Sequence, residues 1–125
     1  MDIEKLYQEV ILDHHKNPRC HGCVSCPDAA CALRNPLCGD QVHIELTLTP
    51  DGRVHQVRFE GHGCVISQAA TSLLADHVEG ASLDEVRKIT PADVVKLLGV
   101  PLSPTRMKCG LLGWKAIQKA VAEEG

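Results

Sequence analysis

Aromatic side chains are nearly absent from this chain of 125 residues, which has one tryptophan, one tyrosine and one phenylalanine. A core that lacks aromatic rings must be built from Leu, Ile, Val and Ala. A chain of this length can bury roughly two-thirds of its unfolded surface, so a stable core needs no disulfide bonds. We therefore expect a single domain over residues 1–125.

An excess of positive charge is missing as well. The formal net charge at pH 7 is −3 and no basic stripe runs along the sequence, which argues against a nucleic-acid partner. The start of the chain, residues 1–5, has no basic region, and no apolar run is long enough to cross a membrane. We expect a cytoplasmic protein with no membrane partner.

Cysteine, by contrast, is abundant, with seven residues. An odd number does not suit a closed disulfide framework, and the cytosol keeps thiols reduced. A cysteine-rich chain in that compartment points to metal binding or catalysis.

The pattern of apolar residues predicts an α+β fold: a small antiparallel sheet with helices packed on one face. Residues 2–16 read as an amphipathic helix, and residues 19–37 read as a loop or a weakly ordered strand. A hairpin follows, with strands near 42–49 and 53–60, a turn at Pro50-Asp51-Gly52 and a bulge between Val54 and Val57. Helices are expected at 65–78, 82–89, 90–99 and 110–123, with an irregular segment at 100–107.

Three cysteines lie beside glycines where loops should meet regular elements. Cys38 precedes the first hairpin strand, and Cys64 and Cys109 are expected to open helices, whose partial positive charge stabilises a thiolate. Asp40 adds a carboxylate, and the four side chains make a tetrahedral ligand set. The alternatives are buried structural cysteines and a turn-capping role for Asp40.

The carboxylate is the odd member of this set. Oxygen is a harder donor than sulfur, and a permanent iron–sulfur cluster is normally held by four thiolates. A set that includes Asp40 therefore suggests a site that releases its cargo.

The segments around these residues resemble the U-type iron–sulfur cluster assembly scaffolds, which include IscU, SufU and the N-terminal domain of NifU. The resemblance rests on Asn35-Pro36-Leu37-Cys38-Gly39-Asp40, on Gly63-Cys64 before a helix of small residues, and on Lys108-Cys109 before an amphipathic helix. Leu6-Tyr7 and the segment 13–19 also look like the first helix of that family and its exit. The resemblance covers nearly the whole chain.

The resemblance implies an IscU/NifU-N-like fold and a role in cluster assembly. A cysteine desulfurase would deliver persulfide sulfur to Cys38, Cys64 and Cys109, and a transient 2Fe–2S cluster would form on these cysteines and Asp40. Apo acceptor proteins would then receive the cluster, with an iron donor or chaperone as further partners. Zinc would occupy the same site when iron is absent.

Such a scaffold has no turnover of its own. One alternative is a zinc-dependent sulfur acceptor with sulfurtransferase activity, which Lys108 favours because Suf-type members carry lysine where Isc-type members carry histidine. The absence of an insertion between Cys64 and Cys109 argues the other way. An electron carrier is a third reading, and Asp40 argues against it. The chaperone-binding segment of Isc-type members is missing near residues 101–105.

Four further cysteines precede this set, in the spacing C-x2-C-x2-C-x4-C: Cys20, Cys23, Cys26 and Cys31. The last gap is one residue longer than in a ferredoxin-type cluster loop. A second zinc or cluster site, a sulfur relay, an oxidant sensor and a loop with incidental thiols all fit this pattern.

Overall fold

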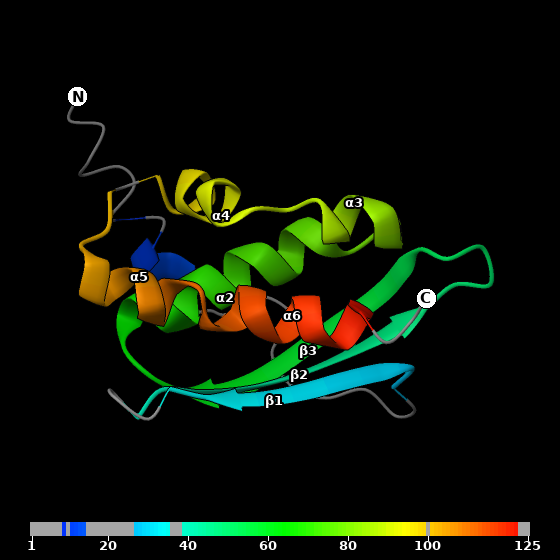
Figure 1. The fold of residues 1–125 in the computed structure, drawn as a ribbon, viewed down its shortest axis with the longest axis horizontal. Helices are drawn as coiled ribbons and strands as arrows, with labels where there is room; N and C mark the ends of the chain where they lie inside the picture. The colour runs from blue at the N-terminus through cyan, green and yellow to red at the C-terminus, as the bar shows by residue number, and fades with distance from the viewer. Residues whose placement is uncertain (1–8, 10, 15–26, 36–38, 100, 123–125) are drawn as a thin grey trace.

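The computed structural model describes residues 9, 11–14, 27–35, 39–99 and 101–122. Its elements form one layer of strands and one of helices (Figure 1). In chain order they are β1 (Ala29–Arg34), β2 (Gln41–Leu48), β3 (Val54–His62), α2 (Val65–Val78), α3 (Leu83–Arg87), α4 (Pro91–Leu98), α5 (Pro104–Gly110) and α6 (Leu112–Ala122).

The sheet is antiparallel, in the order β1-β2-β3. Between β1 and β2, the Asn35 N–H donates to the Asp40 carbonyl at 2.8 Å, and Gly39 has a φ of 76° that favours glycine. Between β2 and β3 the register shifts, because Thr47 pairs with Gln56 while Leu48 pairs with Val54. The predicted hairpin and its bulge are therefore confirmed.

The helices cover one face of this sheet, with α2 and α6 lying directly on the strands (Figure 1). Alternation along β2 sends Ile44 and Leu46 into the core at 0% exposure, while Gln41 and His43 face solvent. Phe59 is fully buried among aliphatic side chains. The predicted α+β class, with helices on one face, is confirmed.

The predicted helix starts rest on local hydrogen bonds. Ser82 and Glu85 form a capping box at α3, and Thr90 and Asp93 form one at α4. The Ser82 N–H that donates to Glu85 lowers the pKa of that carboxyl.

Residues 11–14 are helical, and His14 Nδ1 lies 2.8 Å from Ser72 Oγ on α2. Most of the predicted helix 2–16 lies outside the described residues.

One prediction about secondary structure left two alternatives open, and another needs correction. Residues 29–34 form a regular strand inside the segment predicted as a loop or a weakly ordered strand, because pairing with β2 and packing under α6 outweigh the low strand propensity of alanine. The segment predicted as irregular contains the start of α5, where Ser103 caps the helix and Pro104 occupies its first turn. Cys109 therefore lies in the last turn of α5 and does not open α6.

None of the helices in the described part of the chain has the length and apolar character that a membrane span requires.

The contact between α2 and α6 gives a stability prediction. A Cβ built on Gly113 would lie 3.0 Å from Cβ of Thr71, a side chain that is 2% exposed on α2. We expect Gly113→Ala to lower the free energy of unfolding by about 1–3 kcal/mol, as overpacked cores do. Chemical denaturation checks this, and adding Thr71→Ala should recover part of the loss. Full stability in Gly113→Ala alone would contradict the tight contact.

Candidate metal centre

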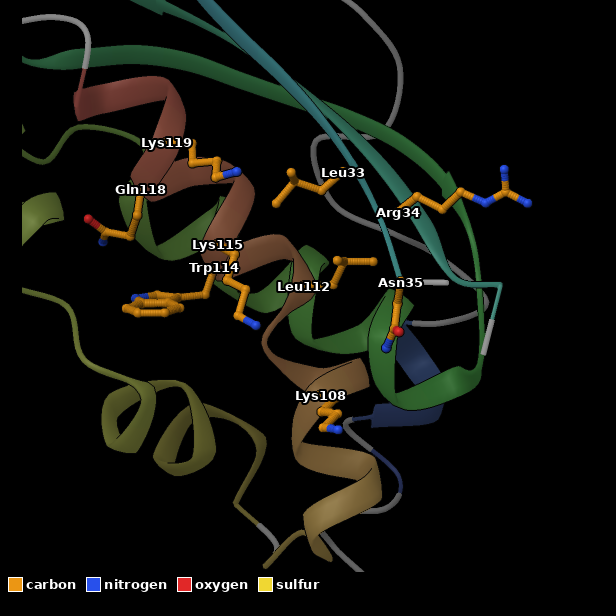
Figure 2. A pocket seen from close by; sticks show the side chains of 9 residues that line it. All are labelled: Leu33, Arg34, Asn35, Lys108, Leu112, Trp114, Lys115, Gln118 and Lys119. Atoms are coloured by element: carbon orange, nitrogen blue, oxygen red, sulfur yellow. The ribbon is translucent and has the colours of Figure 1, made fainter. Parts of the chain in front are cut away.

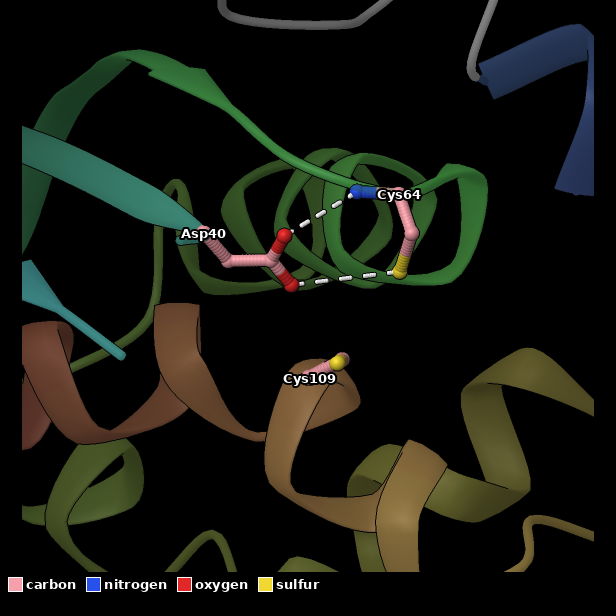
Figure 3. A group of neighbouring side chains, drawn as sticks. All are labelled: Asp40, Cys64 and Cys109. Carbon is pink, nitrogen blue, oxygen red and sulfur yellow. Dashed lines mark hydrogen bonds between the residues drawn. The ribbon is translucent and has the colours of Figure 1, made fainter. Parts of the chain in front are cut away.

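Three of the predicted ligands come together where the sheet meets the helices. Asp40 immediately precedes β2, Cys64 is the N-cap of α2, and Cys109 lies near the end of α5. One ligand atom from each residue lies within 4.8 Å of the others. Figure 3 shows both Asp40 oxygens directed toward Cys64, with the sulfur of Cys109 across from them. Residues far apart in sequence thus form one group through the fold.

Hydrogen bonds fix the relative positions of Asp40 and Cys64. The Cys64 N–H donates to Asp40 Oδ1 at 3.3 Å, and Cys64 Sγ lies 3.9 Å from Asp40 Oδ2. The Ser67 N–H, in the first turn of α2, donates to Cys64 Sγ at 3.4 Å. The Cys64 side chain thus caps the start of α2, the position that the sequence predicted.

The environment of the group is asymmetric. Asp40 and Cys109 are buried, with exposed fractions of 4% and 8%, whereas Cys64 is exposed. The group is therefore held by the core on one side and open to solvent at Cys64. An ion or a partner's thiol can reach it there without unfolding the protein.

The remaining predicted ligands are placed as follows. Cys38 lies outside the described residues, two positions before Asp40 in sequence. Cys20, Cys23 and Cys26 also lie outside them. Cys31 sits in β1, partly buried against the core, and is not a member of the group.

The donor types suit a soft or borderline metal. Two thiolates and a carboxylate are ligands that zinc accepts in tetrahedral sites, and thiolates are also the usual ligands of iron–sulfur clusters. Cys38 is the candidate for the fourth position. His62 and His77, two exposed histidines near Cys64 or on α2, do not belong to the group.

The sequence suggested no role for Ser67, and it did not predict that Gly63 makes room for the Asp40 carboxylate. A Cβ on Gly63 would lie 2.8 Å from Asp40 Oδ1 and 3.2 Å from Ser67 Oγ, so only glycine leaves room for the carboxylate. The sequence signal for Ser67 is its position three residues after the cap Cys64, where helix starts place a free N–H.

We expect Gly63→Ala to displace the Asp40 carboxylate from Cys64. Zinc affinity should fall on the order of 10–100-fold, the usual effect of disturbing the groups that orient metal ligands. Competition with a chromogenic chelator measures this. The matched control is Gly52→Ala in the β2–β3 turn, where a Cβ meets nothing within 4 Å. That variant can lose stability, because Gly52 has a φ of 83°, but it should keep its zinc affinity. Equal affinity in the Gly63 variant and the unaltered chain would refute the role of Gly63.

Comparison with known proteins agrees with this architecture. Residues 6–123 match the model of the NifU-like N-terminal domain family. The zinc-dependent sulfurtransferase SufU of Bacillus subtilis is 32% identical, with 98% of this chain and 94% of that protein covered. The iron–sulfur cluster assembly scaffold protein IscU of Escherichia coli is also 32% identical, with 94% and 92% covered.

A solved structure from Fervidobacterium islandicum AW-1 has the same fold. That protein is described as an iron–sulfur cluster assembly scaffold protein for the SUF system; the TM-score is 0.79 at 27% identity, with 96% of this chain and 99% of that chain covered. The family match over residues 6–123 includes the described sheet, the helices and the elements that carry the three ligands. This chain therefore belongs to the NifU-like N-terminal domain family, the U-type proteins that its sequence resembles.

Proposed function

We propose that this chain is a scaffold on which a 2Fe–2S cluster is assembled and from which it is transferred to acceptor proteins. The observation that carries the proposal is the proximity of Asp40, Cys64 and Cys109, within 4.8 Å of one another at a partly open site. Cys38 supplies the third thiolate in this proposal. The relatives named as iron–sulfur cluster assembly scaffolds support it.

The cluster is the cargo of this site, and its parts come from partners. A cysteine desulfurase delivers sulfur as a persulfide, and a thiolate of the site takes the outer sulfur while the desulfurase cysteine leaves as a thiolate. Each transferred sulfur then needs two electrons from an external reductant to become sulfide. An iron donor or chaperone and apo acceptor proteins complete the partners. Because reduced thiols are essential throughout, we place the protein in the cytoplasm.

Within this proposal, each described ligand has a distinct task. Cys109 anchors the cluster from the buried side, and Cys64 holds it at the open side, where a partner approaches. Asp40 is a harder donor than the thiolates that iron–sulfur clusters prefer, and its bond is the first to be exchanged for a ligand of the acceptor. The scaffold thus holds the cluster with thiolates and releases it through the carboxylate.

A second candidate is a zinc-dependent sulfur acceptor, in which zinc orients the site and a thiolate attacks the persulfide. It is favoured by the similarity to the Bacillus subtilis sulfurtransferase and by Lys108, which is exposed next to Cys109. The donor set fits zinc. The absence of an insertion between Cys64 and Cys109 argues against it. In the described part of that interval, residues 80–99 and 101–107 contain only α3, α4, the start of α5 and their connections.

Metal and sulfide analysis of protein isolated without oxygen separates these functions. A scaffold should contain, or after reconstitution acquire, iron and acid-labile sulfide in equal amounts. One zinc for each chain, no bound sulfide after reconstitution and a faster desulfurase reaction would favour the sulfur acceptor. A cluster that survives repeated redox cycles and cannot be transferred would indicate an electron carrier.

A further inference from the structure

A cleft of about 450 Å³ opens beside the candidate metal centre, between the end of β1 and the helices α5 and α6. Its apolar residues are Leu33, Leu112 and Trp114. Figure 2 shows Lys108 on α5, with Lys115 and Lys119 on α6, around the opening. The cleft therefore combines an apolar surface with a basic rim.

The positive charge of this rim contrasts with the negative net charge of the chain. Among the residues that the structure describes, no acidic side chain lines the cleft, although the whole chain carries a formal charge of −3. Lys108, Lys115 and Lys119 are exposed, and no carboxylate in the described part of the chain pairs with them. Arg58, by comparison, lies 3.0 Å from Glu79.

The spacing of the lysines disfavours a purely structural role. Lys115 and Lys119 are four residues apart on one helix face, and like charges at that spacing destabilise a helix. A bound negative partner removes this repulsion. The rise of an α-helix separates the two residues by about 6 Å along its axis, close to the roughly 6.6 Å between alternate residues of an extended chain.

The cleft also adjoins the candidate centre through the backbone. Lys108 directly precedes Cys109, and Asn35, another lining residue, donates its N–H to the Asp40 carbonyl. A protein segment held in the cleft would therefore bring its own protein to the ligands Cys109 and Asp40.

We propose that this cleft docks an extended acidic segment of a partner protein, with carboxylates at alternate positions and aliphatic side chains between them. The carboxylates meet the lysine rim, and an aliphatic side chain packs against Leu33 and Trp114. The partner is a protein that exchanges sulfur or cluster with the centre, so this part of the inference rests on the proposed function. Charge complementarity selects the segment, and the apolar surface fixes its register.

The peptide acetyl-Glu-Leu-Glu-Leu-Glu-amide is a direct probe. Trp114 is the only tryptophan of the chain and lines the cleft, so its fluorescence reports binding of a peptide that has no aromatic residue. We expect saturable binding at low salt that weakens as salt rises. The double variant Lys115→Glu/Lys119→Glu should weaken binding about tenfold or more, because two attractive pairs become repulsive.

A matched variant changes the net charge equally and leaves the cleft intact. Lys88→Glu/Lys96→Glu alters two exposed lysines at α3 and α4 and should bind the peptide within about twofold of the unaltered chain. Equal losses in the two variants, or equal binding of acetyl-Gln-Leu-Gln-Leu-Gln-amide, would overturn the proposal. Tighter binding of a short oligothymidylate, lost in the Lys115/Lys119 variant alone, would reassign the cleft to nucleic acid.

Metal content separates failure of this inference from failure of the proposed function. Both lysine variants should bind zinc, and should acquire cluster from iron and sulfide salts without a desulfurase, as the unaltered chain does, since neither changes a ligand. If the chain assembles no cluster but still binds the peptide through Lys115 and Lys119, the docking site is supported and the scaffold function is refuted. Normal cluster assembly without peptide binding would refute the docking site alone.

Discussion

Cys109→Ser should abolish stable cluster assembly, and Cys64→Ser and Cys38→Ser should do the same. A serine hydroxyl is a poor ligand for iron or zinc at neutral pH, and Cys109 is 8% exposed, so solvent cannot easily supply a replacement ligand. Structural zinc sites gain about 10–16 kcal/mol from about four ligands, so losing one should weaken zinc binding on the order of 100-fold. Visible absorption and iron analysis after anaerobic reconstitution measure the loss of cluster.

The four cysteines of the preceding segment provide the control. Replacing Cys20, Cys23, Cys26 and Cys31 together by alanine should leave assembly at the main site intact, because Cys31 is not a member of the group around Asp40. The truncated Cys31 side chain can cost some stability, since it packs against the core. Loss of assembly in a quadruple variant that still folds would make that segment part of the main mechanism.

Asp40→Ala should prolong the life of an assembled cluster and slow its transfer several-fold. The carboxylate is a harder donor than the thiolates that iron–sulfur clusters prefer, and removing it leaves three thiolates to retain the cluster. The rate of cluster transfer to an apo-ferredoxin, followed by circular dichroism, measures the effect. Asp51→Ala, in the exposed β2–β3 turn, is a matched control that should transfer at the normal rate.

Asp40 also accepts a hydrogen bond from the Cys64 N–H, and its loss should cost about 1 kcal/mol of stability. Thermal unfolding of the variant reports this cost separately from the transfer rate. Faster transfer from Asp40→Ala in a folded protein would show that the carboxylate retains the cluster, and the release role would be wrong.

Local signals predicted much of the fold. Alternation in β2 and the residues Pro50-Asp51-Gly52 indicated the hairpin, and the capping residues Ser82 and Thr90 indicated α3 and α4. These features depend on neighbours within a few residues, so a single sequence contains them. Cys64 was placed at the start of α2 for the same reason, and the structure confirms that position.

Tertiary contacts decide between the loop and the strand that the sequence left open for residues 29–34. β1 is rich in alanine and becomes a strand through its pairing with β2 and its cover by α6. The start of α5 did have a local signal, Ser103-Pro104, similar to the Thr90-Pro91 start of α4. Because that signal was not recognised, Cys109 was expected to open the last helix, whereas it lies in the last turn of α5.

The sequence identified which residues could be ligands, but it could not predict how they are arranged in space. Sequence spacing cannot bring Asp40, Cys64 and Cys109 within 4.8 Å; the turn before β2, the cap of α2 and the last turn of α5 do so together. The room that Gly63 leaves for Asp40 follows from the same packing. The basic cleft likewise depends on how α6 lies against β1.

The central claim is that the site around Asp40, Cys64 and Cys109 builds a cluster and passes it on. Its most direct test is anaerobic incubation with iron, cysteine, a cysteine desulfurase and a reductant, then addition of an apo-ferredoxin after the desulfurase is removed. Our account predicts that a 2Fe–2S spectrum appears on this protein and then moves to the ferredoxin at matching stoichiometry. Zinc that stays bound throughout, with faster desulfurase turnover and no cluster on this protein, would contradict it.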